Sequence, residues 1–206
     1  MRYLYISILL LSFYSCKVTT VKDYIESDVK ESDTFENLYF ASSSIDYVYK
    51  ADIKVYGNEF SGILIIKKIS EDKHRIVFTS QFGSTFFDIE LENDSFKINS
   101  VVEQLNRKII LNTLIRDFSL VVDENGPVIG KYYNDSYNVL KNRNGKRSNY
   151  YFYRISDKRL DKIVQATKMK EKVIVSFNKV SNDQVAKNIK IDHKNIKLNI
   201  QLNFLK

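Results

Sequence analysis

Cysteine, proline, histidine and tryptophan are scarce or absent in this 206-residue sequence. It contains one cysteine, one proline, two histidines and no tryptophan. The single cysteine has no partner for a disulfide within the chain. With only six glycines as well, the chain is neither collagen-like nor of low complexity. The length fits one domain, and 44% hydrophobic residues are enough to build a sizeable core.

The motifs of common catalytic and nucleotide-binding sites are also missing. No GxSxG, HExxH, GxGxxG or phosphate-loop sequence occurs. His74 and His193 each fall in a predicted turn without a second ligand at a metal-binding spacing, so we expect neither a metal site nor a cofactor. The acidic residues are expected to lie on solvated faces. The sequence therefore favours a protein that binds other molecules over an enzyme.

The formal net charge of +7 allows two interpretations. One is a basic surface that binds nucleic acid or anionic lipid. The other is a lysine-rich composition spread over a solvated surface. No run of five or more basic residues occurs, and a binding patch requires clustering. We therefore expect no nucleic-acid partner.

Residues 1–15 have the pattern of a signal peptide. Arg2 supplies a positive charge, and the apolar or small residues 3–14 are too few to span a bilayer, which takes about 20 residues. Cys16 follows a small residue, which resembles the lipobox of bacterial lipoproteins in its looser Bacteroidetes form. In such proteins the cysteine thiol receives a diacylglycerol and the new amino terminus is usually acylated too. Two or three acyl chains, such as palmitate, make a durable anchor.

Two alternatives for Cys16 fit less well. A plain secretory signal would leave an unpaired thiol in an oxidising compartment, and a buried core cysteine does not suit signal-like surroundings. We predict a lipidated protein anchored to the bacterial outer membrane through Cys16. The absence of acidic residues before Asp23 favours the periplasmic face. Residues 16–44 are interpreted as the lipidated N-terminus and a tether, with a weak helix within residues 21–40.

From residue 45 the hydrophobic period becomes two residues, which is typical of half-buried strands. Residues 60–69 carry apolar side chains on both faces, which predicts a strand covered on both sides. At the end of the chain, apolar and polar residues alternate from Ile196 to Phe204. The predicted strands include residues 45–56, 60–69, 75–82, 85–91, 95–99, 149–155, 160–167, 172–180 and 196–204.

A period near 3.6 residues predicts one helix over residues 101–118. Ser100 and Glu103 have the spacing of a capping box at its start. The fold class is therefore mainly β with one or two helices, in which about nine to eleven antiparallel strands form a curled sheet wrapped around a helix. We assign residues 45–206 to a single domain.

The order of these elements resembles the LolA/LolB family, which carries lipoproteins across the periplasm and inserts them into the outer membrane. The resemblance covers about residues 47–122. It lies in residues 62–67 and in residues 75–89, where a strand is broken at Gly83 and resumes at Phe86 before a helix follows. The tryptophans of many LolB-like proteins are missing. The resemblance implies an unclosed half-barrel over a helical plug, with an apolar cavity that holds acyl chains and needs no covalent chemistry.

The resemblance also implies a set of cavity residues and partners. The expected cargo is an acyl chain or a lipoprotein, and a periplasmic carrier protein is a further expected partner. The alternative is a lipidated scaffold subunit of an outer-membrane complex, with a filled core and an exposed apolar patch instead of a cavity. In that case the residues expected to line the cavity are ordinary core residues instead. These candidate lipid-binding residues are Phe78, Phe82, Phe87, Ile89, Leu91, Leu198, Ile200 and Leu202.

Overall fold

The computed structural model describes residues 19–180 and 185–206. The predicted signal peptide and Cys16 lie outside the described residues. The helical elements of the described chain are a 3-10 turn, η2 (Thr19–Val21), and one α-helix, α2 (Lys108–Val122). The strands are β1 (Ile25–Ser27), β2 (Thr34–Glu36), β3 (Asp46–Val55), β4 (Asn58–Ser70), β5 (Lys73–Ser80), β6 (Thr85–Glu92), β7 (Ser95–Val101), β8 (Asn125–Pro127), β9 (Gly130–Tyr133), β10 (Tyr137–Asn144), β11 (Arg147–Arg154), β12 (Leu160–Ala166), β13 (Glu171–Val180), β14 (Ala186–His193) and β15 (Leu198–Phe204).

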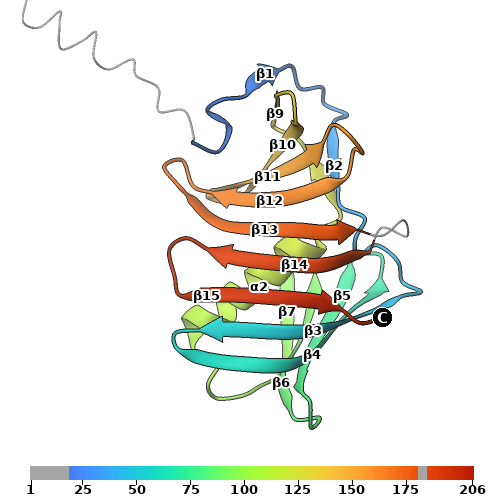
Figure 1. Ribbon diagram of the computed structural model, residues 1–206, viewed down its shortest axis with the longest axis vertical. Helices are drawn as coiled ribbons and strands as arrows, with labels where there is room; N and C mark the ends of the chain where they lie inside the picture. Colours follow the sequence, from blue (N-terminus) through green and yellow to red (C-terminus); the bar gives the residue numbers. More distant parts are fainter. Residues whose placement is uncertain (1–18, 181–184) are drawn as a thin grey trace, which may run out of the picture.

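One large antiparallel sheet dominates the described chain (Figure 1). Its thirteen strands follow the order β1-β9-β10-β11-β12-β13-β14-β15-β3-β4-β5-β6-β7, and β2 pairs with β8 in a separate two-stranded sheet. The large sheet consists of two meanders, β3–β7 and β9–β15, and of strand β1, which pairs with β9 at one edge. Its edge strands β1 and β7 do not pair with each other, so the sheet is not closed. The predicted fold class, an unclosed half-barrel, is confirmed.

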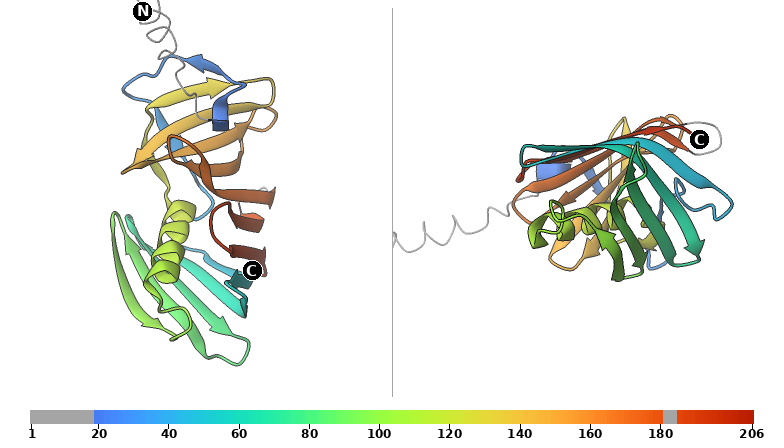
Figure 2. Two further views of the ribbon diagram at one scale, coloured as in Figure 1. Left: turned by 90° about the vertical axis from the view of Figure 1, so that its left-hand side faces the viewer. Right: turned by 90° about the horizontal axis from the view of Figure 1, so that it is seen from below.

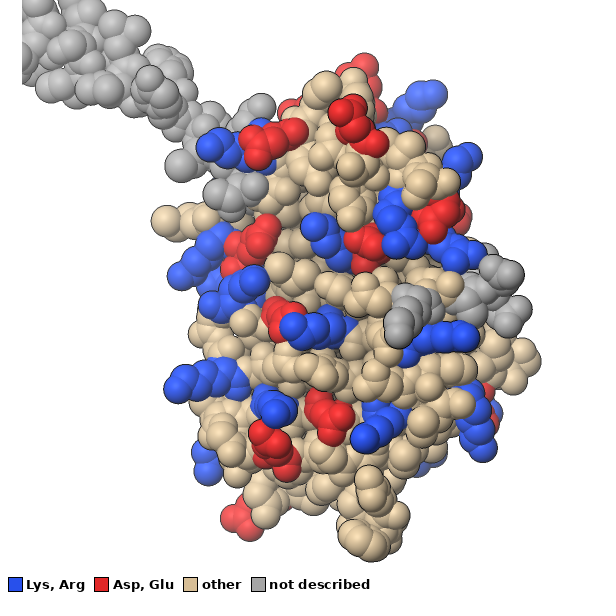
Figure 3. Space-filling view, in the orientation of Figure 1, with Lys and Arg blue, Asp and Glu red and all other residues tan. Residues whose placement is uncertain are grey.

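The pairing of β15 with β3 joins the two meanders. Leu198 lies opposite Val55, and Ile200 lies opposite Ile53. All four side chains are buried, because apolar residues alternate in both strands and the register places them on the same face. The opposite face carries polar residues, and Figure 3 shows cationic and anionic side chains interspersed over it.

Helix α2 covers the concave face of the curled sheet (Figure 2). Its buried residues pack against side chains from both meanders in one large cluster. The ring of Phe118 on α2 lies 5.7 Å from that of Phe87 on β6, which lies 5.5 Å from that of Phe78 on β5. Burying each such ring stabilises the fold by about 2–3 kcal/mol. The concave face and α2 therefore form the main core.

A second, smaller cluster lies on the other side of β11. Tyr150 and Phe152 belong to it, whereas Tyr151 between them belongs to the main core. Val21 and Tyr24 from the N-terminal segment pack onto this cluster, and the Tyr24 ring meets the Phe152 ring edge-on at 5.9 Å. Strand β11 is therefore buried on both faces.

The predicted helix boundaries and cap were wrong. Residues 95–101 form edge strand β7, and α2 begins only at Lys108 after the N-cap Arg107, whose side chain makes no capping hydrogen bond. Ser100 and Glu103 therefore do not cap the helix. The apolar residues Val101, Val102 and Leu105 fit a helical period by chance.

Strand β4 also differs from its prediction. The residues Leu64 and Ile66 are fully buried, but Ile63 and Ile65 on the other face are only half-buried. The sheet is thus covered on one face here. The apolar run reflects β-branched residues on a partly exposed outer face rather than a second covering layer.

The weak helix predicted within residues 21–40 does not form, and the described part of the predicted tether belongs to the folded domain. Strand β1 pairs with β9, and β2 pairs with β8. Phe35 stacks on Tyr151 with ring centroids 3.9 Å apart, and Tyr39 and Phe40 are buried in the main core. The side chain of Asn37 donates hydrogen bonds to the carbonyl oxygens of Val121 and Asp123 at the C-terminal end of α2.

Strands β4 and β5 approach each other so closely at Gly62 that a side chain at this position is expected to destabilise the fold. A β-carbon added at Gly62 would lie 1.9 Å from the carbonyl oxygen of Thr79. Because backbone must move to relieve this contact, Gly62→Ala should lower the free energy of unfolding by about 2 kcal/mol. Urea denaturation measures this change.

The control for this prediction is Glu59→Ala on the same strand. Glu59 forms an exposed ion pair with Lys54, and such pairs contribute little to stability. The control should therefore change the free energy of unfolding by less than about 0.5 kcal/mol. Equal effects of the two substitutions would contradict the close packing of β4 on β5.

Candidate functional site

Seven of the eight candidate lipid-binding residues lie together in the main core. Phe78, Phe87, Ile89, Leu91, Leu198, Ile200 and Leu202 are all exposed by 4% or less. They reach the concave face from β5, β6 and β15. Phe82 does not join them, because it lies in the turn between β5 and β6 and is 97% exposed.

The turn that carries Phe82 projects from the sheet, at the lower end of Figure 1. Gly83 follows with φ of 85°, a conformation that favours glycine. The backbone N–H groups of Phe82 and Ser84 both donate to the hydroxyl oxygen of Ser80. The turn is therefore locally ordered although its aromatic side chain has no cover.

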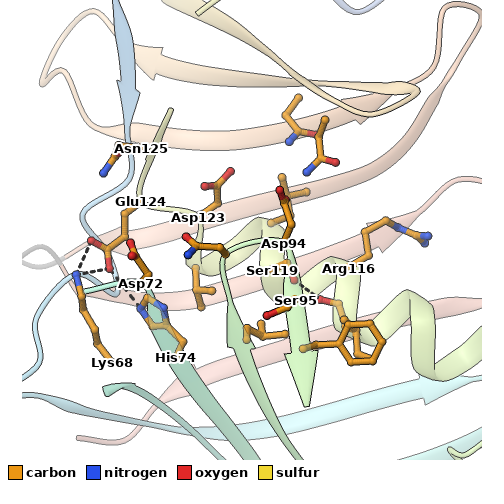
Figure 4. A pocket seen from close by; sticks show the side chains of 18 of the residues that line it. Lys68, Asp72, His74, Asp94, Ser95, Arg116, Ser119, Asp123, Glu124 and Asn125 are labelled. Carbon is orange, nitrogen blue, oxygen red and sulfur yellow. Dashed lines mark hydrogen bonds and ion pairs between the residues drawn. The ribbon is translucent and has the colours of Figure 1, made fainter. Parts of the chain in front are cut away.

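A cleft of about 690 Å³ opens beside the main core (Figure 4). It lies between the β4–β5 and β6–β7 turns, the C-terminal half of α2, and residues of β10, β11 and β12. Leu91 belongs both to the candidate set and to the cleft lining. The apolar lining consists of Leu91, Phe96, Ile115, Leu120 and Val122, and the rest of the lining is polar or charged.

One side of the cleft holds a linked set of titratable side chains, Lys68, Glu124 and His74. The Lys68 Nζ lies 2.7 Å from both carboxylate oxygens of Glu124, and the Nε2 of His74 lies 3.4 Å from one of them. His74 is a buried residue of β5 and not, as predicted, a turn residue. Burial lowers its pKa, although the nearby Phe40 carbonyl oxygen and Glu124 oppose this effect.

The middle of the cleft carries further carboxylates. Burial raises the pKa of Asp123 to about 6, although the hydroxyl of Tyr151 donates a hydrogen bond to it at 3.0 Å. The charges of Asp94 and Glu124 raise the pKa of Asp123 further. Asp72 and Asp94 are exposed, and within the described chain their carboxylates form no hydrogen bond or ion pair.

Arg116 on α2 lines the opposite side of the cleft from Lys68 (Figure 4). Its Nη2 donates to the hydroxyl of Thr113, but its Nε is buried and has no hydrogen-bond partner among the described residues. A buried donor without a partner is costly, and it marks a place where an acceptor from outside the protein would be stabilised.

A buried contact between a histidine and a carboxyl group connects α2 to the sheet. The Nε2 of His193 lies 2.7 Å from the Oδ2 of Asp117, and both side chains are 1% exposed. Burial raises the pKa of Asp117, and His193 opposes this effect. His193 is the last residue of β14 rather than a turn residue as predicted. Because losing either partner would leave a buried polar group unpaired, the pair specifies where α2 sits on the sheet.

Sequence reasoning missed the cleft and the contact between Asp117 and His193. The cleft residues come from two turns, the end of α2 and three later strands, and no short motif connects them. Asp117 and His193 are also distant in sequence.

Within residues 19–180 and 185–206, no group of three or more His, Cys, Asp or Glu residues is placed to hold a metal ion. No helix in this part of the chain is both long and apolar enough to span a bilayer.

An open sheet curled around one helix, with an amphipathic cleft beside it, defines a half-barrel class of protein. No protein-family model and no curated protein matches the sequence. A solved LolA superfamily protein from Nitrosomonas europaea overlays with a TM-score of 0.56, covering 83% of this chain and 88% of that one at 11% identity. The chain therefore has the LolA superfamily fold, and the predicted LolA/LolB-like architecture is confirmed.

Two further solved structures overlay less well, each over 78% of this chain. A DUF1329 family protein from Desulfovibrio piger is 7% identical, with 84% of its chain covered and a TM-score of 0.42. A domain from Vibrio parahaemolyticus named for outer membrane lipoprotein sorting is 8% identical, with 83% of its chain covered and the same score. Scores this low add nothing to the assignment.

The raised pKa of the half-buried Asp123 predicts a pH-dependent contribution to stability. Its pKa is about 6 in the folded protein and about 4 in an unfolded chain. The folded state thus holds this proton more tightly, so the stabilising contribution is complete below pH 4 and is lost as the pH rises through 6. As the pH rises over this range, the free energy of unfolding of the wild type should fall by on the order of 2 kcal/mol relative to that of Asp123→Asn.

Urea denaturation between pH 4 and 7.5 measures the difference between wild type and Asp123→Asn. Comparing the two proteins removes the contributions of all other titrating groups. Asp135→Asn, in the exposed β9–β10 turn, is the control and should follow the wild type. Parallel stability curves for wild type and Asp123→Asn would show that the Asp123 pKa is not raised.

Proposed function

We propose that this chain is a lipid-anchored protein of the outer membrane that binds acyl chains of lipids or lipoproteins between its curled sheet and α2. The role is that of a LolB-like acceptor that passes the chains to the membrane. The convergence of seven candidate residues beneath α2, on the concave face of an unclosed sheet, is the observation that carries the proposal. The LolA superfamily fold supports it.

The chemistry of this function is burial rather than catalysis. Moving an acyl chain from water to an apolar site gains about 0.8 kcal/mol for each CH₂ group. The side chains beneath α2 pack against one another, so an acyl chain would enter as α2 separates from the sheet. The cleft beside Leu91 lies where α2 and β6 meet and is the natural opening for this separation.

The exposed side chain of Phe82 supports the transfer step. Because Phe82 is 97% exposed, its ring gains no free energy from burial in the folded protein. Burying such a side chain in a bilayer gains about 1.5–3 kcal/mol. The projecting β5–β6 turn is therefore suited to touch a membrane while cargo leaves the protein. Attachment of the chain itself would be through lipidated Cys16 on the periplasmic face, with a periplasmic carrier delivering the cargo.

A second function is a lipidated scaffold subunit of an envelope complex. The dense packing beneath α2 favours it, because a scaffold needs no cavity. The outer edge of β7 favours it too, since no strand of the described chain pairs with it and Phe96 and Ile98 are 51% and 37% exposed. Such an edge can pair with a strand of another protein.

A tryptophan reporter can locate bound acyl chains, because the chain has no tryptophan of its own. Phe96→Trp places the reporter in the cleft, and Tyr24→Trp places a matched one in the cluster on the outer face of β11. A lipid with brominated acyl chains should quench the Phe96→Trp emission by at least about half and leave the Tyr24→Trp emission unchanged. The reason is that bromine quenches only at short range, and the acyl chains would lie beneath α2.

The unbrominated lipid controls for structural change in both variants. No quenching in either variant would reject acyl-chain binding and favour the scaffold. Equal quenching in both variants would indicate adsorption to the surface without a specific site, which also contradicts the proposal.

The role of Phe82 predicts slower transfer of cargo to membranes. In Phe82→Ser, the rate of acyl-probe transfer from protein to vesicles should fall by about tenfold, because burial of the ring no longer stabilises the membrane encounter. Probe affinity should stay unchanged, since Phe82 lies outside the core. Met169→Ser is the control, because Met169 is 86% exposed in the β12–β13 turn. Equal slowing in both variants would contradict a specific role for Phe82.

A further inference from the structure

The structure assigns the cleft beside α2 to the headgroup of the bound lipid, and we propose that this headgroup is phosphoethanolamine. This inference rests on the proposed function, since it adds the polar end of the ligand to the acyl chains beneath α2. The headgroup carries an ammonium and a phosphate. Each would meet complementary groups in the cleft.

The cleft attracts cations although the protein as a whole is basic. Five carboxylates line it, from Glu71, Asp72, Asp94, Asp123 and Glu124. The permanent cations are Lys68, which is already paired with Glu124, and Arg116. The net charge of the chain is +7, so this acidic lining is a local reversal of sign. An ammonium group near Asp94 and Asp123 would be attracted over several ångströms.

The end of α2 adds to this attraction. The helix ends at Val122 in the cleft lining, and its last turn contains no basic residue. The carbonyl groups at a helix C-terminus carry a partial negative charge equivalent to about half an elementary charge. Asn37 pairs with two of these carbonyl oxygens but brings no positive charge. A cation in the cleft would therefore be stabilised by the helix and by the carboxylates together.

The spacing of the carboxylates fits an organic ammonium better than a metal ion. No group of three or more acidic, histidine or cysteine side chains in the described chain converges closely enough to hold a metal. An alkylammonium donates three hydrogen bonds in different directions and can reach acceptors that are further apart. The unpaired carboxylates of Asp72 and Asp94 on either side of the cleft are such acceptors (Figure 4).

The phosphate of the headgroup would lie beside Arg116. The buried Nε of this residue has no hydrogen-bond partner among the described residues, and a phosphate oxygen is a strong acceptor for it. The hydroxyls of Ser95 and Ser119 lie between Arg116 and the carboxylates in Figure 4 and line the same cleft. The two ends of a zwitterion thus find groups of opposite charge at separate positions.

The acyl chains have a continuous apolar path from this headgroup position. Leu91 and Ile115 line the cleft and also belong to the main core. A lipid whose headgroup occupies the cleft would therefore direct its chains beneath α2. A headgroup with no ammonium, such as phosphoglycerol, would keep the phosphate contact and place no cation near the carboxylates.

Native mass spectrometry of the full chain, released from detergent micelles, tests this inference. Phosphatidylethanolamine and phosphatidylglycerol with identical acyl chains are titrated separately, and lipid adducts are counted. The wild type should reach half-saturation with phosphatidylethanolamine at a concentration about fivefold lower than with phosphatidylglycerol. This ratio corresponds to roughly 1 kcal/mol of charge interaction.

The key variant is Asp94→Asn, which removes a carboxylate without removing a hydrogen bond or ion pair of the described chain. It should lose most of the preference for phosphatidylethanolamine. Asp94→Lys should reverse that preference. The matched control is Asp135→Asn, because Asn134-Asp135-Ser136 repeats the tripeptide Asn93-Asp94-Ser95 in another exposed turn. This control should bind both lipids like the wild type.

Arg116→Gln tests the phosphate contact separately and should weaken both lipids by a similar factor. Equal binding of the two lipids by the wild type, or equal effects of Asp94→Asn and Asp135→Asn, would overturn the headgroup inference and leave the proposed function standing. An unchanged affinity of Arg116→Gln for both lipids would overturn the phosphate position. No adduct of either lipid on folded wild type would reject the proposed function itself.

Discussion

The structure depends on one helix covering the concave face of a sheet that does not close. A curled sheet of thirteen strands has a large apolar concave face, and among the described elements α2 is the helix that covers it. The rings of Phe78, Phe87 and Phe118 show how closely the two layers meet. Displacing α2 would expose most of this core to water. The same contact is therefore a major source of stability, and it is where the acyl chains of the proposed function would enter.

Polar contacts at specific positions determine where α2 lies on this apolar surface. Hydrophobic packing has little directional preference, but the Asp117–His193 pair joins the middle of the helix to the end of β14. Asn37 holds the C-terminal end of the helix through two carbonyl oxygens. The N-terminal half of α2 has no comparable link in the described chain, and Ile109 there is 60% exposed. The C-terminal half of α2 is therefore held to the sheet by more polar contacts than the N-terminal half.

The sequence predicted most of the sheet because its strands carry a two-residue period. β3 and β15 alternate clearly, since one face of each is buried and the other is solvated. Strand 95–99 was predicted, but the helix was placed too early because Val101, Val102 and Leu105, at the end of β7 and in the turn after it, fit a helical period. Strands β1 and β2 are three residues long, which is too short for periodicity to detect. The cleft could not be predicted, because Lys68, Asp94 and Arg116 are brought together only by the curl of the sheet.

The pairing of β15 with β3 has a consequence for how the chain is made. The first meander, β3–β7, is synthesised well before β15, so the outer edge of β3 stays unpaired while more than half of the domain is translated. During that interval Ile53 and Val55 lie on a strand with an open edge, which is a site for pairing with other chains. Export across the inner membrane in an unfolded state, or protection by a chaperone, would remove this hazard. Correct biogenesis of the domain is therefore expected to depend on delayed folding rather than on folding strand by strand.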